Sequence, residues 1–226
     1  MRYAWHFTPL IEFTYLWGTG LLNTLLLTLT VLMAGTVIAL FAVGALYSKS
    51  SVARRIARSY VDLLRAIPAL VLLGTLYFTL PVVLGINISS FTTAAVALSL
   101  NLAPFVVECI RGAIDSVPTI QFESAMVLGF TGWRSHFYII GPQVLRRVIP
   151  PLVGQYITTL KLTSLAAAIG VQELWNVTSQ ITTATSLPVE SRLFSATLYV
   201  AIILPLLALS ARLERHFDVK GLGLER

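Results

Sequence analysis

The sequence predicts an all-α integral membrane protein with five transmembrane helices, and three observations carry this prediction. Hydrophobic residues make up 56% of the 226 residues and charged residues only 12%, about half the charged fraction of an ordinary soluble domain. Residues 13–48 and 66–107 contain no charged side chain, and about 20 apolar residues suffice for a helix to cross a bilayer. The basic residues gather in three segments that the apolar stretches separate.

The apolar stretches predict the helices in chain order. Residues 1–18 are expected to form an amphipathic or re-entrant start, and the first helix covers about residues 20–47. The second apolar stretch holds two helices, over about 59–84 and 91–113. A fourth is expected over about 152–170 and a fifth over about 193–215. Because we find no internal repeat or linker, residues 1–226 are expected to form one transmembrane domain. Prolines that can kink these helices are Pro68, Pro81, Pro104 and Pro205.

The basic residues predict the orientation in the membrane. Positively charged residues remain on the cytoplasmic side during insertion, and the other connections between the predicted helices carry few of them. With five spans, this places the N-terminus outside and the C-terminus inside. The three basic segments hold Lys49, Arg54, Arg55 and Arg58; Arg111, Arg134, Arg146 and Arg147; and Arg212, Arg215, Lys220 and Arg226. A net charge of +6 therefore indicates membrane topology rather than nucleic-acid binding.

A polar interval, residues 116–148, separates the third and fourth helices and predicts a cytoplasmic helical loop. Ser116 is expected to cap a short helix of about residues 118–128, which Gly129 ends in a left-handed conformation. Thr131 is expected to cap a second helix, which Gly141 and Pro142 stop. By itself the interval is equally compatible with an ordinary surface loop.

Several segments resemble the permease subunits of polar amino acid ABC importers of the histidine, glutamine and glutamate type. Residues 123–129 read Glu-Ser-Ala-Met-Val-Leu-Gly and resemble the EAA loop of that family. Residues 60–68 resemble the start of its second helix, and residues 108–118 contain its E-x-x-R-x-x-I-x-S-x-P pattern. Residues 160–165 and 169–174 resemble its fourth helix, and the likeness extends over about residues 20–217.

The resemblance implies a permease half that works by alternating access in the bacterial inner membrane. Two such subunits would form the path, two ATPase subunits would bind ATP and Mg²⁺, and an extracytoplasmic binding protein would deliver the amino acid. The coupling-loop positions that it implies are Glu123, Ser124, Ala125, Gly129 and Pro142. The sequence has no G-x-x-x-x-G-K-[ST] motif, so ATP hydrolysis is expected on the partner, and this chain is expected to bind no cofactor and to be no enzyme.

Three positions depart from the family pattern. Ser124 replaces an alanine, which exchanges one small residue for another, and Gly141 stands where leucine often precedes the proline. Leu162 stands where many members have an acidic residue that could bind a substrate ammonium group. The absence of this acidic residue favours a second permease subunit of different sequence over a homodimer.

The polar residues near membrane depth are candidates for the translocation path, since their burial is costly. They are Asn101, Lys161, Thr163 and Ser164, with Leu162 between them. Lys161 could instead extend to the membrane surface or donate to backbone carbonyls. Glu108 and Arg111 are three residues apart and could form an ordinary ion pair within one helix. The scattered positions of His6, His136 and His216 make a metal site improbable.

Two other functions are compatible with a membrane bundle. A carrier or channel driven by an ion gradient would be expected to show inverted repeats with paired broken helices, and five spans do not divide into equal repeats. A membrane scaffold without transport activity is the third interpretation, and kinked helices with buried polar groups argue against it.

Overall fold

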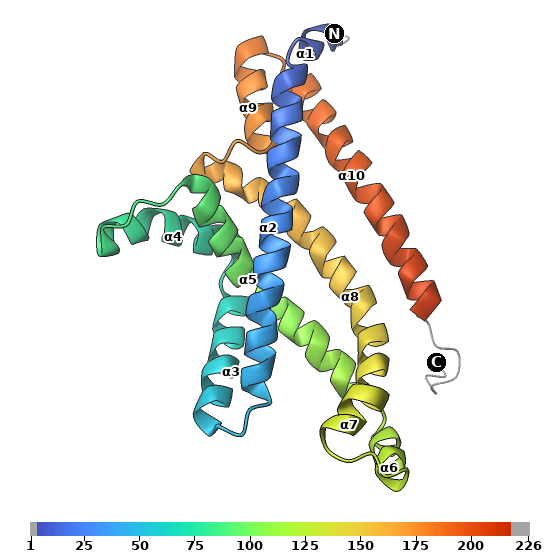
Figure 1. Ribbon diagram of the computed structural model, residues 1–226. Helices are drawn as coiled ribbons and strands as arrows, with labels where there is room; N and C mark the ends of the chain where they lie inside the picture. Colours follow the sequence, from blue (N-terminus) through green and yellow to red (C-terminus); the bar gives the residue numbers. More distant parts are fainter. Residues whose placement is uncertain (1–3, 218–226) are drawn as a thin grey trace.

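The computed structural model describes residues 4–217, apart from the side chain of Trp133, and these residues form an elongated bundle of helices without a strand (Figure 1). A short first turn, α1 (Thr8–Ile11), leads into α2 (Thr14–Leu46), which runs along most of the length of the molecule. The expected start over residues 1–18 is therefore mostly helical from Thr8 onward, and its first three residues lie outside the described part.

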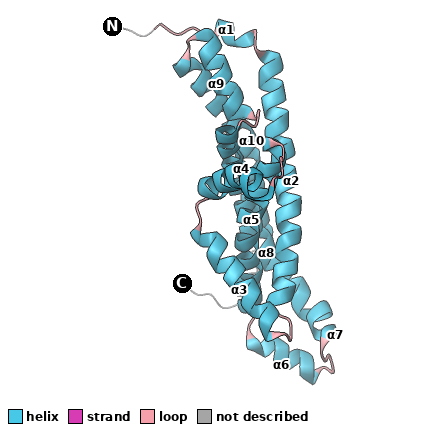
Figure 2. Ribbon diagram, turned by 90° about the vertical axis from the view of Figure 1, so that its left-hand side faces the viewer, coloured by secondary structure: helices cyan, strands magenta, loops and turns pink. Residues whose placement is uncertain are grey.

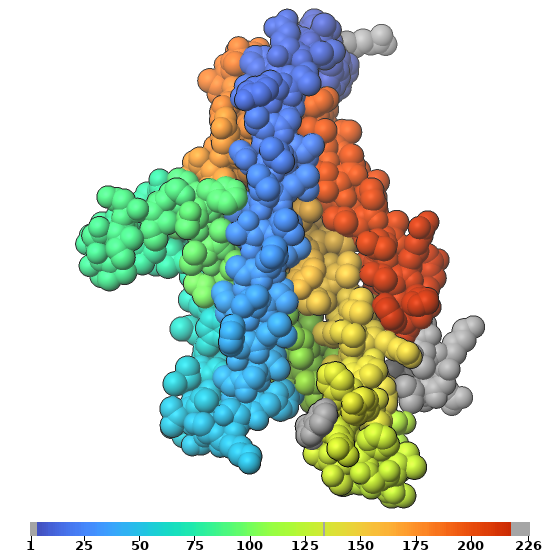
Figure 3. All heavy atoms as spheres, viewed as in Figure 1, coloured from blue at the N-terminus to red at the C-terminus, as the bar shows by residue number. Residues whose placement is uncertain are grey.

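The second predicted helix, residues 59–84, is wrong as a single element. The chain forms α3 (Ser51–Ala66) and α4 (Ala69–Leu84), whose axes differ by 103°. Pro68 has no N–H to donate, and the residue before a proline is driven out of the helical region. Ile67 accordingly has an extended backbone with ψ 123°. As a result α4 projects sideways from the bundle (Figures 1 and 3).

Helix α5 (Ser90–Asp115) is the most buried of the long helices. It packs against α2, α3, α4 and α8, and its contact with α2 is the most extensive. The main core fills this junction with buried aliphatic side chains such as Leu27, Val31, Leu98 and Leu102. The close approach depends on Gly35, because a Cβ atom there would lie 2.9 Å from the Leu102 side chain.

The polar interval folds into α6 (Thr119–Val127), α7 (Trp133–Ser135) and a π-helical turn (His136–Ile140) that continues into α8 (Gly141–Leu162). Gly141 and Pro142 therefore begin a long helix, and the expectation that they stop one is wrong. A proline in the first turn of a helix loses no hydrogen bond. The fourth predicted helix, 152–170, covers only the second half of α8 and a 3-10 segment (Thr163–Ile169).

Two helices complete the chain. The sequence predicted no helix between the expected fourth and fifth helices and so missed α9 (Leu174–Thr185). The expected fifth helix lies within α10 (Pro188–Phe217). Glu173 starts α9: its buried carboxylate accepts hydrogen bonds from the N–H groups of Trp175 at 2.9 Å and Asn176 at 2.8 Å. The Tyr199 hydroxyl donates to the same carboxylate at 3.0 Å and links α9 to α10.

Within residues 4–217, four helical segments are long and apolar enough to cross a membrane, namely α2, α5, α10 and the continuous helix from His136 to Ile169. The bent pair α3–α4 passes the same test when taken together, which gives up to five spans. Helices α6 and α7 lie at one end of the molecule, and α1 and α9 lie at the other (Figure 2).

Candidate functional site

The segment from α6 to the π-helical turn forms a protruding knob at one end of the bundle (Figures 1 and 3). Its surface combines charged and apolar side chains. Glu123 and Ser124 are exposed, and Val127 is 88% exposed. The other large apolar side chains that the knob exposes are Ile120, Met126, Leu128, Phe137 and Tyr138. An exposed apolar surface of this kind is typical of a protein interaction site.

Helix α6 begins without the predicted cap. Ser116 ends α5 instead, and its hydroxyl donates to the Ala113 carbonyl at 2.8 Å. Pro118 takes the position before α6 with an extended backbone, ψ 142°, and so reverses the chain between the two helices. The expectation that Ser116 caps α6 is wrong because the C-terminal end of α5 uses its side chain.

Helix α6 ends at Gly129 as predicted. Gly129 has φ +80°, and the Phe130 N–H donates to the Ala125 carbonyl at 2.9 Å. The Gly129 N–H donates to the Met126 carbonyl at 3.0 Å. These two bonds form the Schellman motif that satisfies the last carbonyls of a helix. Ala125 is only 1% exposed and faces inward, whereas Glu123 on the same helix faces solvent.

Two side chains of α8 hold this region: one contacts the end of α5, from which the chain enters the knob, and the other contacts α6 within the knob. The Arg147 guanidinium donates to the backbone carbonyl and to the hydroxyl of Ser116, the latter at 3.0 Å. One turn earlier, the Gln143 amide donates to the Gln121 side chain at 3.3 Å. Sequence reasoning missed both residues, since their partners lie 31 and 22 positions away. Their spacing of four on one helix is the only signal that the sequence carries.

Gly141 has a steric role where the knob joins α8. In the π-helical turn the Gly141 N–H donates to the His136 carbonyl. A Cβ atom on Gly141 would lie 2.8 Å from that carbonyl oxygen. Pro142 follows it, exposed, in the first turn of α8. The glycine therefore permits the π turn that joins the knob to α8.

The candidate path residues lie on two neighbouring elements, α5 and the end of α8 with its 3-10 segment, which pack against each other. Asn101 on α5 is 6% exposed. Thr163 is fully buried and its hydroxyl donates to the Leu160 carbonyl at 2.7 Å. Ser164 donates to the Lys161 carbonyl at 2.8 Å. Each hydroxyl therefore donates its proton to a carbonyl of its own helical segment, and its oxygen can still accept a hydrogen bond from another group.

Lys161 and Leu162 end α8 in different surroundings. Lys161 is exposed on the isolated chain, whereas Leu162 packs against the main core. A carboxylate at position 162 would lose water contacts there, and burial of an unpaired charge is costly. The leucine thus belongs to the packing of this subunit.

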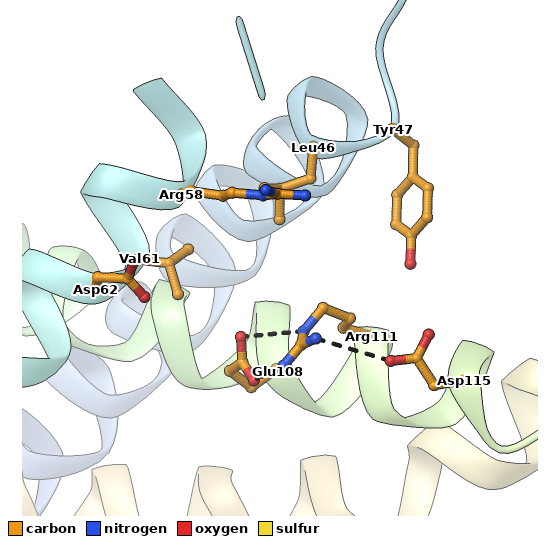
Figure 4. Close-up of a pocket in the computed structure, with 8 residues that line it drawn as sticks. All are labelled: Leu46, Tyr47, Arg58, Val61, Asp62, Glu108, Arg111 and Asp115. Atoms are coloured by element: carbon orange, nitrogen blue, oxygen red, sulfur yellow. Dashed lines mark hydrogen bonds and ion pairs between the residues drawn. The ribbon is translucent and has the colours of Figure 1, made fainter. Parts of the chain in front are cut away.

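Glu108 and Arg111 form an ion pair on α5, with distances of 2.8 and 3.3 Å (Figure 4). Arg65 of α3 approaches Glu108 at 3.7 Å, and Asp115 approaches Arg111 at 3.8 Å. The pair lines a cavity of about 400 Å³ between the end of α2, α3 and α5. Burial and the nearby Asp115 raise the pKa of Tyr47 at the rim, and Arg111 opposes that shift. Within residues 4–217, no group of three His, Cys, Asp or Glu side chains could hold a metal ion.

Solved structures with a similar fold are ABC transporters. A crystal structure of an amino acid ABC transporter with histidines matches 95% of this chain and 100% of that chain, with a TM-score of 0.90 and 30% identity. An inward-facing structure of the MetNI methionine ABC transporter matches 91% of this chain and 98% of that chain, with a TM-score of 0.74. At 21% identity the second likeness concerns the fold alone.

Curated relatives and a family description agree with that fold. The probable amino-acid ABC transporter permease protein YckA of Bacillus subtilis (strain 168) is 41% identical over 155 residues, 69% of this chain and 68% of that protein. The glutamine transport system permease protein GlnP of Escherichia coli (strain K12) is 32% identical over 201 residues, 88% of this chain and 92% of that protein. Residues 32–220 match the family described as binding-protein-dependent transport system inner membrane component. This chain therefore belongs to that family.

Proposed function

We propose that this chain is the permease subunit of a bacterial ABC importer and forms half of the inner-membrane path for a polar amino acid. The names of the relatives YckA and GlnP support the substrate class. The observation that carries the proposal is the α6–α7 knob, which leaves the bundle, exposes apolar surface and is attached to α5 and α8. A bundle without a soluble partner would not be expected to expose this apolar surface to water.

The proposed topology has five spans, with the N-terminus outside and the C-terminus inside. It counts α3 and α4 as one broken span, and lipid or a partner subunit would cover the projecting α4. Broken helices are tolerated at membrane depth where neighbouring protein satisfies the backbone. The knob and the turn between α2 and α3 lie at the same end of the molecule, which supports a shared cytoplasmic side (Figure 2).

The proposed mechanism couples ATP binding on a partner ATPase to motion of this bundle. The ATPase holds the nucleotide and Mg²⁺, while this chain binds neither. The exposed face of α6, with Glu123, Ser124 and Met126, would dock on the ATPase. Closure of the ATPase pair would move the knob, the contact of Gln143 with α6 would transmit that motion to α8, and the contact of Arg147 would link α8 to the end of α5.

The proposed translocation path passes the buried polar groups. Asn101, Thr163 and Ser164 would offer acceptors to the substrate, and Lys161 would face the path where a second permease subunit closes it. Leu162 offers no carboxylate to an ammonium group, so we propose that the second subunit has a different sequence. An extracytoplasmic binding protein would deliver the amino acid at the end that holds α1 and α9.

Pull-down of this chain from its native membrane in mild detergent tests the proposal. We expect a P-loop ATPase to copurify with the wild type and to be lost with Glu123→Lys, because the substitution reverses a charge on the docking face. Glu12→Lys reverses an exposed carboxylate near the other end and should keep the ATPase. Retention of full ATP-driven transport by the Glu123→Lys variant would refute the docking role.

The same preparation decides the composition of the complex. Recovery of a second, different permease would support the argument from Leu162, and a homodimer would contradict it. An oligomer without any ATPase would favour the gradient-driven carrier instead.

A further inference from the structure

Helix α3 has three distinct faces. Ala57 and Val61 face the core and are buried. Val52, Ile56 and Leu63 form an exposed apolar stripe, with Ile56 65% exposed. Between these faces lie basic side chains: residues 48–66 contain five basic residues and one acidic residue. A polar face rich in arginine beside an exposed apolar stripe is typical of a helix at a membrane surface.

The arginines of α3 differ in what they contact. Arg54 donates to the carbonyls of Ser48 at 2.7 Å and Lys49 at 2.9 Å, so it holds the turn between α2 and α3. Arg65 approaches Glu108. Within the described part of the chain, Arg55 and Arg58 form neither a hydrogen bond nor an ion pair. Two guanidinium groups therefore remain available to an external acceptor.

These two groups line one pocket of about 300 Å³ on the surface of α3. Two hydroxyls and one carboxylate complete it; the full lining is Ser51, Arg54, Arg55, Arg58, Ser59 and Asp62. In Figure 4 the Arg58 side chain extends away from the α3 backbone above the neighbouring cavity, without a partner among the residues drawn. Guanidinium groups bind phosphate oxygens through paired N–H donors. Three arginines and one aspartate leave a positive site that suits a phosphodiester.

We infer that the pocket on α3 binds the headgroup of an anionic phospholipid in the cytoplasmic leaflet, with its acyl chains along Val52, Ile56 and Leu63. Anionic lipids are enriched there, and basic residues next to a membrane span attract them. The apolar stripe borders the pocket because Arg55 and Ser59 lie within one turn of Ile56. The inference rests on the proposed orientation, which places the turn between α2 and α3 in the cytoplasm.

Native mass spectrometry of the intact purified complex with added phosphatidylglycerol tests the site. The R55Q/R58Q variant is expected to retain the lipid about 25-fold less well, because each basic residue near an anionic membrane surface contributes about 1 kcal/mol, or about fivefold. R55K/R58K keeps the charge and should retain most of the binding. The matched control is R212Q/R215Q in exposed positions near the end of α10, which should change retention less than twofold.

Three results would overturn the inference: equal retention of phosphatidylcholine, equal loss in R212Q/R215Q, or full displacement by inorganic phosphate, which would indicate a site for the free ion. Orientation is tested separately by labelling Lys49→Cys, exposed in the turn between α2 and α3 and outside the pocket, in a Cys109→Ser background with a maleimide that does not cross the membrane. Labelling in intact cells would refute the proposed topology, whereas labelling only in opened vesicles would support it. Cytoplasmic labelling together with no retention of phosphatidylglycerol by the wild type, or with equal retention by the wild type and R55Q/R58Q, would therefore count against the lipid site alone.

Discussion

The attachment of the knob to the bundle is most directly tested at Arg147. Its guanidinium spans from α8 to Ser116, where α5 ends and the chain turns toward α6. Arg147→Ala removes both hydrogen bonds between α8 and the end of α5 and leaves the contact of Gln143 with Gln121 of α6 in place. The turn that leads into the knob should then leave α8 more often, and α6 should open more often in that detached state, while the residues of its docking face are unchanged.

The expected magnitude follows from the two bonds. A hydrogen bond to a charged group contributes about 1.5–3 kcal/mol. Ser116 is exposed and Arg147 is half-buried, so solvent replaces part of the loss, and we take about 2 kcal/mol for both bonds together. Since 1.4 kcal/mol corresponds to a factor of ten, the detached population should rise about 30-fold.

Two measurements follow the detachment. Hydrogen exchange of the amides in α6 should accelerate by up to about 30-fold if they exchange from the detached state. In liposomes that contain the whole transporter, the ATP hydrolysed per transported molecule should rise, since the ATPase still docks but moves the bundle less effectively. Arg146→Ala is the matched control: Arg146 is exposed and, among residues 4–217, has no hydrogen bond or ion pair.

Identical exchange rates and identical coupling ratios in the Arg147→Ala and Arg146→Ala variants would refute this reasoning. Faster exchange in α6 with unchanged coupling would show that the contact stabilises the loop without transmitting force.

Packing and protonation give two further predictions. Gly35→Val should destabilise the protein by about 1–3 kcal/mol through overpacking against Leu102. Gly44→Val is the control, because a Cβ atom at position 44 would meet open space, and it should cost only the change in helix propensity. Equal thermal midpoints of the two variants in detergent would contradict the packing argument. Burial raises the pKa of Glu173 more than the N–H groups of α9 and the Tyr199 hydroxyl lower it. The folded state therefore binds the Glu173 proton more tightly than the unfolded state does. The contribution of protonated Glu173 to the free energy of unfolding is complete below the unfolded pKa near 4.5, and it is lost as the pH rises through the folded pKa. The thermal midpoints of the wild type and of Glu173→Gln are measured over a range of pH. The difference, wild type minus variant, should decline as the pH rises, and a flat or rising difference would contradict the raised pKa of Glu173.

Most elements of the fold were predictable because membrane helices are recognised in a sequence by their length and apolar composition. The expected helices over 20–47, 91–113 and 193–215 all lie almost entirely within α2, α5 and α10. The left-handed Gly129 was also predictable, since glycine adopts positive φ without steric cost. The break at Pro68 was predicted only as a kink, because sequence does not report a bend angle such as 103°.

Other features depend on which elements meet. Ser116 was a reasonable helix cap by type, yet it serves the end of α5 because Pro118 delays the start of α6. Helix α9 was missed because its threonine-rich sequence carries only a weak apolar pattern, and its stability comes from the buried Glu173 cap and from packing on α2 and α10.

The sequence alone determined that the chain is an α-helical membrane protein and that a polar loop interrupts it, because those properties follow from local composition. Its motifs identified the family for the same reason, since they are contiguous. Only the tertiary structure decided that Arg147 and Gln143 hold the knob and the turn leading into it, and that Gly35 admits Leu102. It also decided that Arg55 and Arg58 have no partner among the described residues. These are relations between side chains that are distant in sequence, and packing of the helices creates them.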